Sequence, residues 1–254
     1  MDSPAAPAST RSSPTRRRLE TGGLLLAFLA YALLVITHLG VYAGGSDASG
    51  YMNSARLIRT GNMHIPQRAI EGLPPGTLPY FAYVPLGFTP VAHGEMVPTY
   101  PPGLSLLMAG FSAITSEESG PWIAIGAHAL FGVLLMYAWG RELKFSPLVS
   151  ALGALLLGLC PLYLFNALEA LSDSPALVWT TAAVYCAWRG RERIAWTFVA
   201  GFVVAIAVLI RPTNVVVLLP VAVALGVSPR RWLALIGGGF PGAFFISLYN
   251  VRLY

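Results

Sequence analysis

The chain has 254 residues, of which 56% are hydrophobic and only 11% are charged, and it carries a net charge of +5. A soluble globular protein has about 25% charged residues, so this composition excludes an ordinary soluble domain and indicates an integral membrane protein. The two cysteines, Cys160 and Cys186, both lie in apolar runs and indicate neither a disulfide framework nor a zinc-binding spacing. The sequence also has no phosphate-binding loop, dinucleotide-binding turn, nucleophile elbow or HExxH helix.

The amino-terminal segment, residues 1–20, is rich in Pro, Ser, Ala and Arg, so we expect a disordered basic leader in the cytoplasm. An apolar run over residues 22–42 follows it. This run is longer than the apolar part of a signal peptide and lacks a convincing cleavage site. As a helix it would be about 31 Å long, which matches the ~30 Å hydrocarbon core of a bilayer. We therefore predict an uncleaved first membrane span.

Six further apolar runs predict six more spans within a membrane-embedded module of residues 21–254. The predicted fold class is an all-α polytopic membrane protein with about seven transmembrane helices. The six runs cover residues 121–140, 148–165, 174–188, 194–210, 213–227 and 232–249.

The charged residues predict the orientation of these spans. Eleven of the 16 Lys and Arg residues lie in the leader or in the loops that are cytoplasmic when the amino terminus is inside, as the positive-inside rule requires. Seven of the 11 acidic residues lie on the other side. The basic net charge therefore reflects topology in a cytoplasmic (plasma) membrane, and we expect no nucleic-acid partner.

The first extracytoplasmic loop, residues 43–120, is much longer than a connector needs to be, which is typical of a functional loop. After Asp47, apolar residues recur with helical spacing at Ala48, Tyr51, Met52, Ala55 and Ile58. This pattern predicts an amphipathic helix that lies in the membrane interface. The sequence YPPG at 100–103 predicts the start of a second short interfacial helix over residues 104–114, because proline suits the first turn.

Asp47 lies a few residues beyond the first predicted span, in the sequence GGSDASGY. It suits the N-cap of the helix that follows. It also suits a general base or a metal ligand at the membrane surface, since ionisable groups at this depth are candidate functional residues. The two roles are compatible.

A second acidic pair, Glu169 and Asp173, lies between two predicted spans on the same side of the membrane as Asp47. The two residues are four apart, so on one helix they would share a face. The sequence around Asp173 is also an ordinary helix start. Capping and a role in the site both remain open.

Five further residues complete the predicted substrate-binding set. Arg211 ends a span on the outer side, where it would either reach lipid phosphates or hold a phosphate group of the substrate. His93 and Glu95 could reach a substrate or a metal, although a loop histidine near a glutamate is more often only solvated. Arg56 lies off the apolar stripe of the first interfacial helix, and Tyr100 begins the second.

Together these features resemble the membrane-embedded C-type (GT-C) glycosyltransferases. The shared pattern is a basic leader, one span, an acid just outside it, an interfacial helix, the YPPG turn and a D-x-P sequence at 173–175, and the resemblance covers roughly residues 20–254. Within that class the chain is most similar to the lipid-carrier-dependent group that includes the dolichyl-phosphate-mannose–protein mannosyltransferases and the bacterial aminoarabinose transferase.

The resemblance implies transfer of a sugar from a polyprenyl-phosphate donor to an acceptor glycan, lipid or protein at the extracytoplasmic face, with inversion at the anomeric carbon. Asp47 matches the catalytic acid of the first loop and would act as the general base. Asp173 matches a second acidic position, and Arg211 would stabilise the departing phosphate. Many relatives have paired acids where Asp47 is alone, so a divalent metal at Asp47 and Asp173 remains an open expectation and no cofactor is certain.

Relatives of this kind are usually longer, so we expect the chain to be a short form, the amino-terminal part of a split gene or an incomplete product. The competing interpretation is a non-enzymatic membrane protein, such as a transporter or flippase of a lipid-linked substrate or a subunit of a larger complex. A transporter favours charged or broken helices near the bilayer midplane. Here the predicted spans are nearly free of charge, which favours surface chemistry.

Overall fold

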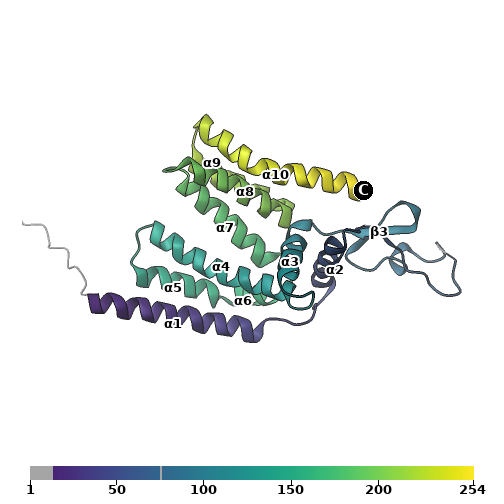
Figure 1. Cartoon of the computed structure of the whole chain (residues 1–254), viewed down its shortest axis with the longest axis horizontal. Helices are drawn as coiled ribbons and strands as arrows, with labels where there is room; N and C mark the ends of the chain where they lie inside the picture. The colour runs from purple at the N-terminus through teal and green to yellow at the C-terminus, as the bar shows by residue number, and fades with distance from the viewer. Residues whose placement is uncertain (1–13, 75) are drawn as a thin grey trace, which may run out of the picture.

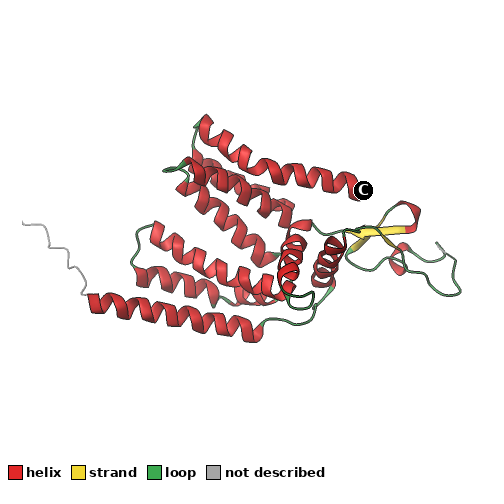
Figure 2. Cartoon of the chain, viewed as in Figure 1, coloured by secondary structure: helices red, strands yellow, loops and turns green. Residues whose placement is uncertain are grey.

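The computed structural model describes residues 14–74 and 76–254 and is almost entirely helical (Figures 1 and 2). Most helices run side by side, and two short helices and a small sheet lie at one end of the bundle. The α-helices are α1 Pro14–His38, α2 Ser46–Thr60, α3 Pro102–Ile114, α4 Gly120–Glu142, α5 Pro147–Gly158, α6 Pro161–Leu168, α7 Asp173–Arg189, α8 Ile194–Ile210, α9 Leu218–Leu225 and α10 Pro229–Leu253.

Three helices in the described part of the chain are long and apolar enough to cross a membrane: Leu19–His38 within α1, α4 and α10. The α5–α6 pair passes the same criterion only as a unit, and it is bent by 63°. α8 and the segment Pro212–Leu225 are apolar but shorter. The protein is thus helical with three or four candidate membrane spans, and the predicted count of seven is not shown.

Two predicted segments differ from the structure. α1 begins at Pro14, so part of the segment predicted as a disordered leader is helical; residues 1–13 lie outside the described part of the chain. The predicted span over residues 148–165 is broken at Cys160, because the helix cannot continue into Pro161 without losing a backbone hydrogen bond and the residue before proline avoids the α conformation. Cys160 is extended, and Pro161 begins α6.

The loop between α1 and α4 forms both predicted short helices and also a small sheet that the sequence analysis did not predict. α2 packs on α3, and α3 packs on α4 and α8. The predicted stripe of α2 faces this interior: Ala48, Tyr51 and Ala55 are buried, and Met52 and Ile58 pack against the same cluster. The sheet is antiparallel with the order β1-β3-β2, from β1 Ile65–Pro66, β2 Phe88–Pro90 and β3 Glu95–Pro98. Three 3₁₀ segments are η1 Tyr80–Ala82, η2 Ala92–Gly94 and η3 Pro212–Val217.

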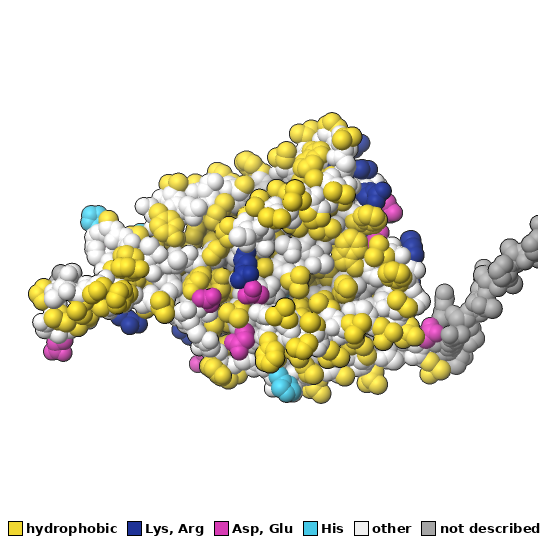
Figure 3. Space-filling model, turned by 180° about the vertical axis from the view of Figure 1, so that it is seen from behind, with side chains coloured by type: hydrophobic (Ala, Val, Ile, Leu, Met, Phe, Trp, Pro, Cys, Tyr) yellow, Lys and Arg dark blue, Asp and Glu magenta, His cyan; other side chains and the backbone are white. Residues whose placement is uncertain are grey.

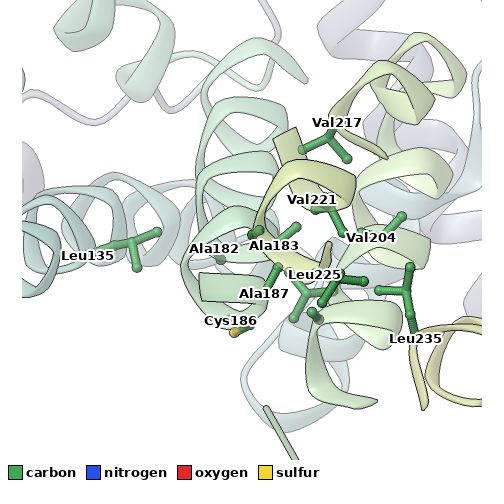
Figure 4. Packing of buried hydrophobic residues seen from close by; sticks show 13 residues of the cluster. Leu135, Ala182, Ala183, Cys186, Ala187, Val204, Val217, Val221, Leu225 and Leu235 are labelled. Carbon is green, nitrogen blue, oxygen red and sulfur yellow. The ribbon is translucent and has the colours of Figure 1, made fainter. Parts of the chain in front are cut away.

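Small residues let the later helices approach closely. The largest buried cluster combines alanines of α7 with valines and leucines of α8, α9 and α10 (Figure 4). A Cβ on Gly201 of α8 would lie 2.0 Å from the carbonyl oxygen of Leu235, and one on Gly238 of α10 would lie 1.9 Å from that of Phe198. Small residues at helix crossings are typical of helices that associate in membranes. This packing positions the carboxyl end of α8, and with it Arg211.

Candidate functional site

Asp47 lies in the first turn of α2, and its carboxylate is bound by Tyr100, which lies just before α3. The N-cap of α2 is Gly45, with no side-chain capping bond, so the carboxylate is not used as a cap. The phenol of Tyr100 donates a hydrogen bond of 2.5 Å to Oδ1 of Asp47, and Ser46 donates a second of 3.2 Å to the same atom. Asp47 itself is exposed. Its second carboxylate oxygen has no protein hydrogen-bond partner among the described residues.

Glycine allows Tyr100 to reach Asp47. A Cβ on Gly50, one turn into α2, would lie 2.2 Å from Cε2 of Tyr100, and Gly87 packs against the same two residues. The ring of Tyr100 also lies 4.8 Å, centroid to centroid, from that of Tyr51. Burial, and next the hydrogen bond to Asp47, raise the pKa of Tyr100. The phenol therefore remains protonated and keeps donating at neutral pH.

Arg211 and Asp173 form the second half of the site. The guanidinium of Arg211 donates two hydrogen bonds to the Asp173 carboxylate, of 2.8 Å to Oδ1 and 3.2 Å to Oδ2, and its Nε donates to the hydroxyl of Ser172 at 2.9 Å. Asp173 is the first residue of α7, and the N-cap, Ser172, makes no capping bond. The side chains of Arg211 and Asp173 are 42% and 43% exposed, so this bidentate pair remains accessible to a ligand.

Tyr51 joins the two halves. It is buried on α2, where it lies against Tyr100 and close to Ser172 and Arg211. Burial is the main reason that the pKa of Tyr51 is raised; the Ser172 hydroxyl and Arg211 oppose that rise, while Asp47 and Asp173 add to it. All four groups therefore act on one phenol. The sequence indicates Tyr51 only as part of the apolar stripe, and its spacing of one helical turn from Asp47 was the available signal for a role in the site.

The close contact between α3 and α8 brings these groups together. A Cβ on Gly103 would lie 2.4 Å from the backbone nitrogen of Ile210, so the YPPG turn sits directly against the end of α8. Arg211 follows immediately as the C-cap of α8. Figure 3 shows acidic side chains gathered around a basic one in the middle of a largely apolar face.

Glu169 borders this cluster but does not share a helix face with Asp173, and that prediction was wrong. Glu169 is the extended C-cap of α6, and the chain turns before α7 begins. Its carboxylate instead lies beside the turn that enters α2, where a Cβ on Gly44 would be 3.2 Å from Oε2. We refer below to Asp47, Tyr51, Tyr100, Glu169, Ser172, Asp173 and Arg211 as the acidic cluster.

The other three predicted site residues lie elsewhere. Arg56 is exposed and donates to Asn53 at 3.3 Å; nine residues of helix at about 100° each put it on the opposite side of α2 from Asp47. His93 is exposed in η2 with a positive φ of 62°. Glu95 accepts a hydrogen bond from Nδ1 of His64 at 3.0 Å, at the sheet. Within the described residues, no three His, Cys, Asp or Glu side chains come together in a metal-binding group.

An apolar groove opens beside the acidic cluster. Its volume is about 680 Å³, and it runs between α8 and α10 to the start of α3. Gly201, Val208 and Phe240 line its walls, and Tyr100 and Pro101 line its end. Tyr100 therefore contacts both the groove and the Asp47 carboxylate.

Comparison with known families matches residues 126–239 to the model described as dolichyl-phosphate-mannose-protein mannosyltransferase. Comparisons with curated proteins and with solved structures gave no match. The matched segment runs from α4 into α10 and contains Glu169, Asp173 and Arg211, whereas Asp47 and Tyr100 lie before it. The chain thus carries, over residues 126–239, a glycosyltransferase domain of the dolichyl-phosphate-mannose-protein mannosyltransferase family, a GT-C family of membrane enzymes.

Proposed function

We propose that the protein transfers a sugar from a polyprenyl-phosphate donor to an acceptor hydroxyl, with Asp47 as the general base and with inversion at the anomeric carbon. The observation that carries the proposal is the acidic cluster itself. It combines an accessible carboxylate, a hydrogen-bonded phenol and an accessible arginine at the end of a long apolar groove. A lipid-linked sugar phosphate has matching parts: an apolar chain, an anionic phosphate and an acceptor proton to be removed.

In the proposed reaction the acceptor oxygen attacks the anomeric carbon while its proton passes to Asp47. The bond between that carbon and the phosphate oxygen breaks, and the electron pair leaves with the polyprenyl phosphate. A base must be within about 2.6–3.2 Å of the proton donor. The free carboxylate oxygen of Asp47 suits this role, because Tyr100 and Ser46 both bind the other oxygen.

Arg211 would stabilise the negative charge that develops on the departing phosphate. Its bidentate contact with Asp173 fixes the direction of the guanidinium, and its partial exposure leaves room for a ligand. An arginine held in this way suits phosphate better than a mobile lysine, because its planar fork can bind two oxygens. Asp173 would therefore act mainly by orienting Arg211.

The description of the matching family names a dolichyl-phosphate-mannose donor and a protein acceptor, so we propose this donor class first. We further propose that the acidic cluster lies on the extracytoplasmic side of a membrane that the chain crosses seven times. The distribution of Lys and Arg supports that orientation. Because Asp47 is a single acid, the site would need no divalent metal if Arg211 alone neutralises the charge of the phosphate.

The test is transfer of radiolabelled mannose from dolichyl-phosphate-mannose to a hydroxyl-containing peptide by membranes that contain the protein. Asp47→Asn keeps the size of the side chain and removes the basic oxygen, so we expect transfer to fall by about 10²-fold or more. Retention of a photoreactive donor analogue should not change, because the proposed donor contacts are made by Arg211 and the groove.

Glu117→Gln is the matched control. Glu117 lies in the same loop, is 57% exposed and pairs with Arg59 at 2.8 Å, so the same change from acid to amide should leave transfer within about twofold. Near-normal turnover in Asp47→Asn would exclude the general-base role. An equal loss in both variants would indicate a general effect of charge in the loop.

A further inference from the structure

A second groove lies at the opposite end of the bundle, far from the acidic cluster. Its volume is about 610 Å³, and it runs between α7 and α9. Trp139, Trp188, Val223 and Leu225 line its walls. Arg191, in the α7–α8 turn, and Arg231, in the first turn of α10, lie at its end. We call this the basic groove.

The two arginines are fixed in place without any carboxylate partner among the residues that the structure describes. The guanidinium of Arg191 stacks on Trp188, 4.5 Å from the ring centroid. Arg231 donates to the carbonyl oxygens of Leu225 at 3.1 Å and of Arg191 at 3.0 Å. The nearby Glu142 forms an ion pair with Arg189, with a nitrogen–oxygen distance of 3.1 Å. Glu192, the neighbour of Arg191 in the chain, forms no ion pair with Arg191 or Arg231, so two positive charges lie at the groove without a bonded acid among the described residues.

The tryptophans indicate that this end of the bundle lies in the membrane interface. Four of the six tryptophans lie in the helix turns nearest this end of the bundle, namely Trp139, Trp188, Trp196 and Trp232. Tryptophan is enriched where a helix passes through the lipid headgroups. Figure 3 shows basic side chains gathered at one edge of the molecule, away from the sheet. The basic groove thus begins at headgroup level and extends along α7 and α9 toward the apolar region.

From this geometry we infer that the basic groove binds an anionic phospholipid, with the phosphate at Arg191 and Arg231 and one acyl chain between α7 and α9. Charge complementarity identifies the occupant, because a zwitterionic headgroup would place its own cation beside two guanidiniums. Val223, which is 85% exposed in the protein alone, would be covered by the acyl chain. Basic pockets between helices are a known mode of lipid recognition. This inference does not depend on the proposed transfer reaction.

The experiment measures the affinity of the full chain, delipidated in detergent, for phosphatidylglycerol and phosphatidylcholine by native mass spectrometry and thermal unfolding. We expect phosphatidylglycerol to bind more tightly and to raise the midpoint of unfolding in proportion to its concentration. Arg191→Gln should weaken phosphatidylglycerol binding about fivefold, since one arginine near a membrane surface contributes about 1 kcal/mol. Arg193→Gln removes the same charge from the same turn outside the groove and should change binding less than twofold.

A second variant keeps the positive charges of the basic groove and fills the space proposed for the acyl chain. Val223→Trp should reduce phosphatidylglycerol binding, whereas Val227→Trp, at a 98% exposed position outside the groove, should not. Equal losses in Arg191→Gln and Arg193→Gln would overturn the inference in favour of diffuse attraction. Equal binding of the two lipids, or inorganic phosphate that competes fully with phosphatidylglycerol, would overturn it as well.

Discussion

The two ends of the helical bundle use arginine in different ways. At the basic end, Arg231 binds backbone carbonyls, while Arg189 and Arg191 lie over the rings of Trp196 and Trp188 at 5.3 and 4.5 Å from the centroids. At the other end, Arg211 binds a carboxylate and a hydroxyl, and two phenols and a further carboxylate lie close by. Both ends contain an ion pair, Arg189–Glu142 at the basic end and Arg211–Asp173 at the other, but only the acidic cluster brings an arginine together with more than one carboxylate.

From this difference we infer that the basic end contacts membrane lipids and that the acidic cluster is the reactive site. The arginines of the basic end join the ends of neighbouring helices and leave an excess of positive charge, which suits the headgroup region of an anionic leaflet. The acidic cluster draws its groups from α2, α7 and the ends of α6 and α8, together with Tyr100 just before α3, and it leaves both Asp47 and the Arg211–Asp173 pair accessible. Convergence from four helices on an accessible set of charges is typical of a site.

The largest expected effect concerns sidedness, because the two ends should lie on opposite sides of the membrane. In a background that lacks Cys160 and Cys186, Thr77→Cys should react with a membrane-impermeant thiol reagent in intact cells. Ser228→Cys, in the turn before α10, should react only after permeabilisation. Labelling of Ser228→Cys alone in intact cells would invert the topology, and labelling of both would place the two ends on one side.

The next effect concerns how α3 is held against α8. In Gly103→Ala the new methyl group would clash with the backbone of Leu209 and Ile210 at 2.4 Å, which cannot move cheaply. We expect a loss of about 1–3 kcal/mol of stability together with most of the transfer activity, measured by thermal unfolding and by the mannose assay.

Gly110→Ala is the control on the same helix, since nothing lies within 4 Å of its Cβ position. It should be neutral or stabilise the protein by about 0.4–1 kcal/mol. If both variants behave alike, the close contact between α3 and α8 does not hold the cluster together.

The elements that the sequence predicted well depend on local patterns. The period of Ala48, Tyr51 and Ala55 is sufficient to define the buried face of α2. The bounds 194–210 of α8 agree with the structure, because an unbroken apolar run between two arginines leaves little choice. Pro161 also indicated the break at Cys160, but the prediction gave more weight to the length of the apolar run.

The remaining features depend on contacts between distant residues. β1 pairs with β3 across the whole loop, from Ile65 to Met96, and strands this short carry no periodic signal. The sequence indicated Asp173 and Arg211 separately, but their pairing follows from how α7 packs on α8. The role of Tyr51 was missed because an aromatic residue on an apolar stripe usually packs in the interior.

Tyr100→Phe tests whether the phenol contributes to Asp47 beyond packing. The variant keeps the ring that packs against Tyr51 and removes the 2.5 Å hydrogen bond. A hydrogen bond to a charged group contributes about 1.5–3 kcal/mol, and exposure of Asp47 puts the effect at the lower limit, so we expect about a tenfold loss of transfer with unchanged donor binding. The double variant with Asp47→Asn should lose no more than Asp47→Asn alone. Additive losses would mean that Tyr100 acts on the substrate directly.

The smallest effect is expected for Asp173→Asn, because Asp173 orients Arg211 and touches no reacting atom in the proposed reaction. Asparagine retains one acceptor oxygen, so Arg211 loses one of its two bonds to this side chain. The pair is about two-fifths exposed, and exposed ion pairs contribute about 0.2–1 kcal/mol. We expect a loss of transfer of up to about fivefold, seen mainly as weaker donor binding, with unfolding and membrane insertion unchanged. Unchanged donor binding in Asp173→Asn would contradict the proposed contact between Arg211 and the donor phosphate. A loss as large as that of Asp47→Asn would instead show that Asp173 takes part in the chemistry, and the acidic cluster would then contain two working carboxylates.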